Sequence, residues 1–210
     1  MEECIEFFNS MIGDNVNVWL CTYGGCKSNN IWQLIEKSNP NIKIYSENGY
    51  DIKGCHYINP IPNKKSKNFD INKNGIKCGI FLFSKNPFLS LSSMIRRNDH
   101  TTNYKKLTNK DEFDLDDWIK NIEIQVRNWT DDPIKKYDLD YPIIYINTDK
   151  FNELQNHLVD YLTEIFGSFN NINYIEKERV TKNINEDLLD KLDSLVRYQN
   201  KLEDIKIFRL

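Results

Sequence analysis

The sequence lacks any apolar run that approaches the roughly 20 residues needed to cross a bilayer. Residues 1–8 are acidic, where a secretory signal would be basic. The five cysteines, an odd number, include no CxxC pair and lie at Cys4, Cys21, Cys26, Cys55 and Cys78. These absences predict a soluble cytoplasmic protein whose thiols are reduced and mostly buried.

A large charge of one sign is also missing. The 210 residues carry 28 Lys and Arg against 31 Asp and Glu, which gives a formal net charge of −3 at pH 7. That balance is too small to indicate a nucleic-acid partner. Neither an internal repeat nor a clear domain boundary interrupts the chain, and 40% of its residues are apolar. We therefore expect one domain over residues 1–210, built around one core.

Short apolar runs rich in β-branched and aromatic residues are typical of strands that are buried on both faces of a parallel sheet. Such runs cover residues 16–22, 77–84 and 141–146, and a weaker one covers 51–58. Helical spacing of apolar residues predicts a helix that Ser28 caps and that stops before Pro40, and further helices over residues 89–97, 111–129, 151–166 and 186–198. This alternation predicts an α/β fold of three layers, with a central parallel sheet between helices.

The burial of the tryptophans and of two histidines can be predicted from the residues around them. The tryptophans fall on apolar faces and are expected in the core, at Trp19, Trp32, Trp118 and Trp129. His100 and His157 are expected on the surface.

Residues 23–28, YGGCKS, join the first predicted strand to the first predicted helix. A glycine loop at such a place presents backbone N–H groups and the positive end of the helix dipole, which favour a bound anion such as phosphate or sulfate. Lys27 and Ser28 match the end of a Walker A loop, but Cys26 stands in place of its glycine. A plain turn between a strand and a helix is the alternative.

Four segments follow one another in an order that indicates a family. TYGGCKSN at 22–29 is similar to a loop motif T-Y-P-K-S-G-T-T, and KGCHYINP at 53–60 is similar to K-T-H-L-P. FLFSKNP at 81–87, followed by Ser93, is similar to R-[ND]-P-x(5)-S. Residues 141–167 are similar to a block that reads V-x-Y-E-D-L and ends at F-L-G. Together these segments resemble the sulfotransferases, enzymes that use 3′-phosphoadenosine 5′-phosphosulfate (PAPS).

The resemblance implies a P-loop NTPase-like sulfotransferase fold that transfers a sulfuryl group from PAPS to a hydroxyl or amine of a small-molecule or carbohydrate acceptor. The product would be adenosine 3′,5′-bisphosphate (PAP). Lys27 would stabilise the leaving phosphate, and His56 would take the acceptor proton. No metal, nucleic acid or membrane is implied, and Cys26, Cys55 and His56 do not have the spacing of a compact zinc site. The implied cofactor-binding residues are Tyr23, Gly24, Gly25, Cys26, Lys27, Ser28, Asn29, Lys85 and Ser93.

Departures from the family pattern leave alternatives open. Gly25 stands where the family carries Lys or Arg, and Lys27 is the nearby replacement. Lys85 stands in place of the arginine that binds the 3′-phosphate, which gives a point charge instead of a bidentate fork. Arg96 and Arg97 are candidates to compensate. The C-terminal R-K-G element of cytosolic members has no counterpart.

Other residues and other functions remain candidates. Glu47 and Asp51 are alternatives to His56 as the base. A non-catalytic member that keeps the fold and an anion-binding loop is the second hypothesis. A P-loop kinase is a third, with Asp149 as an approximate Walker B residue.

Overall fold

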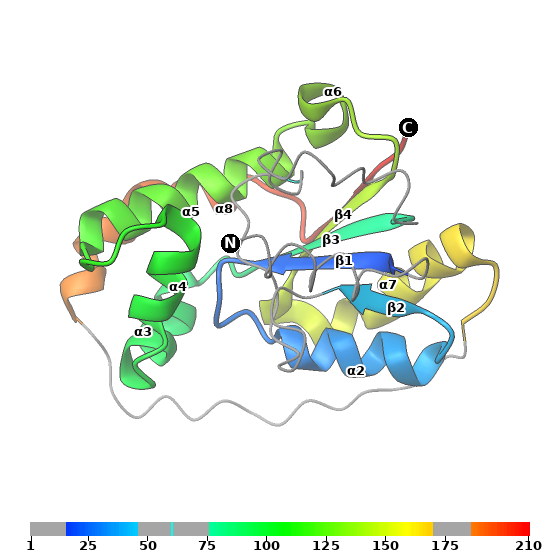
Figure 1. Ribbon diagram of the computed structural model, residues 1–210, viewed down its shortest axis with the longest axis horizontal. Helices are drawn as coiled ribbons and strands as arrows, with labels where there is room; N and C mark the ends of the chain where they lie inside the picture. Colours follow the sequence, from blue (N-terminus) through cyan, green and yellow to red (C-terminus); the bar gives the residue numbers. More distant parts are fainter. Residues whose placement is uncertain (1–15, 46–59, 61–75, 170–185) are drawn as a thin grey trace, which may run out of the picture.

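The computed structural model describes residues 16–45, 60, 76–169 and 186–210. Within them five strands form one sheet in the order β2-β1-β3-β4-β5 (Figure 1). The neighbouring strands β1 (Val16–Thr22), β2 (Lys43–Tyr45), β3 (Cys78–Phe83) and β4 (Ile143–Asn147) are parallel. The α/β class is therefore confirmed.

The prediction of a wholly parallel sheet is wrong at one edge. There, β5 (Ile205–Phe208) runs antiparallel to β4. The chain reaches β5 at the carboxyl end of β4, where the N–H of Asn147 donates to the carbonyl of Asp204 at 2.6 Å. From this point β5 runs back along β4 and pairs with it.

The order of the strands changes direction at β1. From β1 the chain continues to β2 on one side and later to β3 on the other. In doubly wound folds such a reversal leaves a crevice beyond the carboxyl ends of the two strands, and ligands bind there. The corresponding place here lies between the loop after β1 and the loop after β3.

Helices cover both faces of the sheet. In Figure 1, α2 and α7 lie on one side of the sheet and α5 and α8 on the other, whereas α3 and α4 lie beyond the carboxyl ends of the parallel strands. The helices are α2 (Ser28–Ser38), α3 (Pro87–Arg96), α4 (His100–Thr108), α5 (Leu115–Thr130), α6 (Pro133–Tyr137), α7 (Phe151–Phe166) and α8 (Asp193–Gln199). None of the helices in the described part of the chain is both long and apolar enough to pass through a bilayer.

Most predicted elements are confirmed with small shifts of their ends. The strand over 16–22 and the helix over 151–166 have the predicted bounds. The predicted helix over 186–198 is wrong in its first half, which forms two 3₁₀ turns, Glu186–Leu188 and Asp190–Leu192, before α8 begins. The weaker predicted strand over 51–58 lies outside the described residues.

Aromatic rings join α5 to the sheet. Trp19, Trp118 and Trp129 are fully buried, as expected. Trp129 stacks on Phe81 at 5.4 Å between ring centroids and meets Trp19 edge to face at 5.5 Å. Trp32 is the exception, because it is only half-buried and its indole N–H donates to Glu36 at 3.1 Å. The two ring contacts of Trp129 fix α5 over β1 and β3.

The two histidines differ from each other. His157 is exposed, as predicted. His100 is half-buried instead, with its ring edge-on to Phe113 at 4.7 Å between centroids. Burial lowers the pKa of His100 below its usual 6.5. The prediction of a surface histidine is wrong there because Phe113 and Trp118 form an aromatic cluster around it.

Candidate functional site

The loop after β1 turns sharply into α2. Gly24 and Gly25 have φ of +101° and +66°, and Lys27 has φ of 55°. The N–H of Gly24 donates to Oγ1 of Thr22 at 3.1 Å, which closes the first part of the turn. The prediction that Ser28 caps α2 is wrong, because Lys27 occupies the cap position without a side-chain hydrogen bond and Ser28 is the first helical residue. The left-handed backbone of Lys27 redirects the chain at that point.

The same loop packs closely against α3 at its two glycines. A Cβ atom at Gly25 would lie 2.5 Å from the carbonyl oxygen of Ser90. One at Gly24 would lie 2.5 Å from Sδ of Met94. A lysine or arginine at position 25 would therefore collide with the backbone of α3. The fold therefore excludes a side chain at position 25 on steric grounds.

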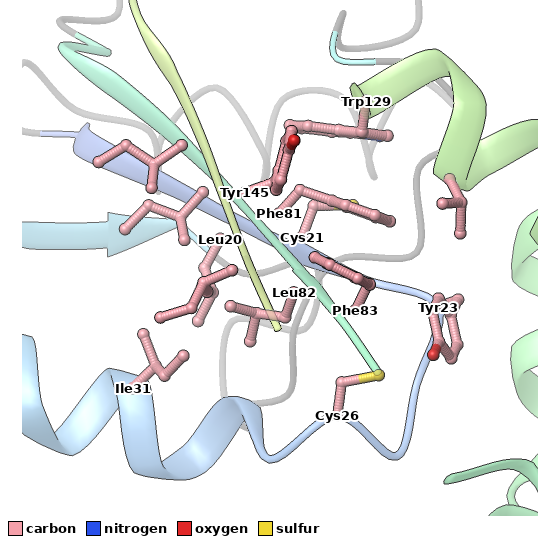
Figure 2. Close-up of a cluster of buried hydrophobic side chains, with 14 of the residues drawn as sticks. Leu20, Cys21, Tyr23, Cys26, Ile31, Phe81, Leu82, Phe83, Trp129 and Tyr145 are labelled. Carbon is pink, nitrogen blue, oxygen red and sulfur yellow. The ribbon is translucent and has the colours of Figure 1, made fainter. Parts of the chain in front are cut away.

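Tyr23 joins the loop after β1 to the loop after β3. Its hydroxyl donates to the carbonyl of Ser84 at 3.2 Å and accepts from the N–H of Ser84 at 2.9 Å. Burial raises the pKa of Tyr23 well above 10, so the phenol stays protonated. Figure 2 shows Tyr23 and Cys26 on the loop between β1 and α2, next to the apolar side chains of the core. The side chain of Tyr23 therefore positions the two loops relative to each other.

Cys26 is also buried at this turn. Its thiol donates to the carbonyl of Gly24 at 3.2 Å. Cys21 and Cys78, on β1 and β3, are likewise buried, in agreement with the prediction of buried thiols. Cys4 and Cys55 lie outside the described residues.

The loop after β3 is fixed to the end of β4 by Asp149. The hydroxyl of Ser84 donates to the two carboxylate oxygens of Asp149 at 2.7 and 2.9 Å. The N–H of Asn86 donates to the same carboxylate at 3.0 Å. Asp149 lies at the end of β4, with β3 between it and β1. This carboxylate therefore holds loops together, whereas a Walker B residue would face the loop after β1.

Lys85 is held by a carboxylate that the sequence did not single out. Its Nζ lies 2.8 Å from Oδ1 of Asp204, just before β5. Asp204 also binds Nζ of Lys150 at 2.8 Å and accepts from Nδ2 of Asn147 at 3.0 Å. Burial opposes the charge of Asp204, but the hydrogen bonds from Lys150, Lys85 and Asn147 outweigh it and hold its pKa well below the usual 3.8. Asp204 is therefore ionised at neutral pH.

The other predicted 3′-phosphate residues lie along α3 and at its C-terminal end. Ser93 is half-buried, and it is six residues beyond Pro87, or about 9 Å along the helix axis. Arg96 and Arg97 are exposed, and Arg97 pairs with Asp99 at 2.8 Å. The joint role of Ser93 and Lys85 at one phosphate stays a prediction.

The residues predicted to act on the acceptor, His56 and its alternatives Glu47 and Asp51, lie outside the described residues, as does most of the segment around them. In the part of the chain that is described, no three His, Cys, Asp or Glu side chains are grouped so that they could hold a metal ion.

An open depression of about 650 Å³ lies elsewhere, where α4 connects to α5. Its lining combines Tyr104, Phe113 and Lys110 with the acids Asp111, Glu112, Asp114 and Asp117. Inside it, the hydroxyl of Tyr104 and Nζ of Lys110 both donate to Asp117 at 2.8 Å. The acidic lining opposes a phosphate ligand, and no predicted site residue belongs to it.

No protein family, curated protein or solved structure matches this chain. The chemistry of the site is therefore inferred from its own residues.

The described site is best suited to an anion. The first turn of α2 contributes the N–H groups of Ser28 and Asn29, for which an α-helix has no partner of its own. The positive end of the helix dipole and the charge of Lys27 lie at the same turn. These donors point to a phosphate or sulfate at the loop after β1.

Proposed function

We propose that the chain is a sulfotransferase, which transfers the sulfuryl group of PAPS to a hydroxyl or amine of an acceptor. The observation that supports this most is the contact of the two predicted phosphate elements. The loop after β1 packs on α3 so closely that the Cβ position of Gly25 lies 2.5 Å from the carbonyl oxygen of Ser90. A nucleotide with two phosphate groups could then reach both elements at the switch point of the sheet.

The residues present fit the 5′ end of PAPS. When bound, PAPS supplies a sulfuryl group that is already activated by its bond to the 5′-phosphate. Lys27 and the first turn of α2 bind and orient that phosphate, and they stabilise the negative charge that it gains as the sulfuryl group leaves. Tyr23 holds the loop in place through Ser84. The proton of the acceptor goes to His56, or to Glu47 or Asp51, in this proposal.

A non-catalytic binding protein on the same fold is the second candidate, and a specific contact favours it. The ammonium of Lys85 is paired with Asp204 at 2.8 Å, so the cation expected at the 3′-phosphate is engaged by the protein itself. A chain with such a pair can bind an anion at α2 without binding PAPS tightly. A P-loop kinase has less support, because Asp149 is engaged with Ser84 and Asn86.

Calorimetric titration distinguishes these functions. We expect the purified chain to bind PAP, and to bind it more tightly than ATP with magnesium. Lys27→Ala should weaken PAP binding about tenfold to a hundredfold, because a hydrogen bond to a charged group contributes about 1.5–3 kcal/mol. The matched control is Lys37→Ala, which removes an exposed lysine from the last turn of the same helix and should leave the affinity unchanged.

Transfer of labelled sulfate from PAPS to a panel of hydroxyl and amine acceptors then tests catalysis. Transfer that Lys27→Ala abolishes supports the enzyme. Weak or absent binding of PAP, with no transfer to any acceptor, supports the non-catalytic protein. Binding of ATP with magnesium but not of PAP contradicts the sulfotransferase and supports a kinase.

A further inference from the structure

Asp204 is an anion that the protein already holds near the proposed site. Its carboxylate accepts from two ammonium groups, those of Lys85 and Lys150, and from the side-chain amide of Asn147. The three donors come from the loop after β3, from the end of β4 and from the turn that follows it. Two cations and an amide around one anion are also the donors that a phosphate group needs.

The place is shielded from water only in part. The side chains of Lys85 and Asp204 are 25% and 24% exposed, so a ligand can approach them. The charges around them cancel, because Lys85 and Lys150 stand against Asp204 and the nearby Asp149. A second phosphate would therefore meet no net attraction while Asp204 keeps its position.

A connected set of contacts links Asp204 to the loop after β1, across β3 and β4. Tyr23 binds both backbone groups of Ser84, and Lys85 is the next residue. The N–H of Lys85 donates to Oδ1 of Asn147 at 3.3 Å, and Nδ2 of Asn147 donates to Asp204. A ligand phosphate at α2 and the carboxylate of Asp204 thus lie on the same carboxyl edge of the sheet.

We propose that Asp204 determines the specificity of the site for a second phosphate: its carboxylate occupies the donors of Lys85 and Lys150, and a nucleotide's second phosphate binds only by displacing it. This inference rests on the proposed function. It assigns Asp204 and Lys150 a part in ligand selection. A nucleotide with a single 5′-phosphate needs only the turn at α2 and is indifferent to Asp204.

The test is calorimetric titration of the full chain with PAP and with adenosine 5′-monophosphate. Asp204→Asn keeps the size of the side chain and removes its charge. We expect this variant to bind PAP at least tenfold more tightly than the unmodified chain and to bind the monophosphate with an affinity changed less than twofold. An equal gain for both nucleotides, or no gain for PAP, would overturn the proposal.

Two further variants make the test specific. Glu203→Gln is the matched control, because it removes the same charge from the adjacent residue, which is exposed and pairs with Lys206 at 3.0 Å. It should leave both affinities unchanged. In the Asp204→Asn background, Lys85→Ala should abolish the gain for PAP, because the gain requires the released ammonium. A gain that persists without Lys85 would overturn the proposal.

A measurement on the unmodified chain covers the case in which Asp204→Asn fails to fold. The carboxyl carbon resonance of Asp204 should move when PAP is added and stay in place with the monophosphate. A resonance that PAP does not move, while calorimetry shows that PAP binds, would overturn the role of Asp204 and leave the proposed function intact. Failure of both nucleotides to bind would instead overturn the proposed function and this inference with it.

Discussion

At the scale of single residues, Gly25 has two requirements that only glycine meets. Its φ of +66° lies in the left-handed region, and α3 occupies the space where a side chain would begin. A left-handed backbone costs an L-residue about 1–2 kcal/mol, and forcing atoms into a packed place costs about 1–3 kcal/mol more. Position 25 therefore couples the conformation of the loop to the position of α3.

We predict that Gly25→Ala lowers the free energy of unfolding by about 3 kcal/mol, as the sum of these two costs. The matched control is Gly167→Ala, because Gly167 has φ of +87° but, among the described residues, only its chain neighbours come within 4 Å of its Cβ position. It should lower the free energy by only about 1–2 kcal/mol. Urea unfolding of both variants measures the difference. Equal losses would contradict the close packing of the loop on α3.

Single residues also show where sequence reasoning reached its limit. Lys85 could be selected because its spacing to Ser93 is a local pattern. Asp204 gave no such signal, since it is far along the chain and becomes a neighbour of Lys85 only when β5 pairs with β4. Likewise the glycine at position 25 could be recognised as a departure, but no local pattern contains its contact with Ser90.

At the scale of elements, the cap residue determines where a helix starts. The helix over 111–129 was predicted from an acidic beginning, and the structure starts it at Leu115 because Asp114 is its cap. The carboxylate of Asp114 accepts from the N–H of Asp117 at 2.9 Å. A carboxylate at this end also interacts favourably with the helix dipole.

We predict that Asp114→Ala lowers the free energy of unfolding by about 1 kcal/mol, because an N–H of the first turn loses its acceptor. Asp114→Asn keeps a side-chain oxygen at the cap and should lower it by no more than a few tenths of that amount. Thermal unfolding of the two variants gives the comparison. A loss in the asparagine variant as large as in the alanine variant would show that the charge, and not the hydrogen bond, is what stabilises α5.

Elements that the sequence did not predict are short or partly exposed. The strand β5 has four residues, all half-buried, and so lacks the continuous apolar run that predicted β1 and β3. The strand β2 has three residues, and α6 has five. The pairing of such segments is decided by their neighbours in space. Long buried elements could be predicted because each has a clear pattern. A strand covered on both faces is a continuous apolar run, and a helix covered on one face repeats its apolar residues over many positions.

At the scale of the whole molecule, the strands and helices share one core cluster. It includes side chains from β1, β3 and β4 and from α2, α5 and α7, together with the thiols of Cys21, Cys26 and Cys78. That arrangement agrees with a single core, although one domain over residues 1–210 stays a prediction. Thiol reactivity offers a test, because a buried thiol reacts only when the structure opens.

We predict that at most two of the five cysteines, Cys4 and Cys55, react quickly with Ellman's reagent in the native chain, and that all five react in denaturant. Burial raises the pKa of Cys78, which slows its reaction further. Peptide mapping should show that labelling of Cys21 and Cys78 rises with urea along one common transition. Separate transitions for β1 and β3 would contradict a single cooperative core.

The direction of β5 determines which charge reaches the carboxyl edge of the sheet. Because β5 runs against β4, the residue before it, Asp204, lies beside Asn147, whereas Arg209, after it, lies at the other end and pairs with Glu164 at 2.9 Å. A parallel strand of the same sequence would exchange the two and bring a guanidinium to Lys85 and Lys150. Three cations there would attract any anion, so under the proposed role of Asp204 the direction of this four-residue strand would let the edge discriminate among phosphorylated ligands.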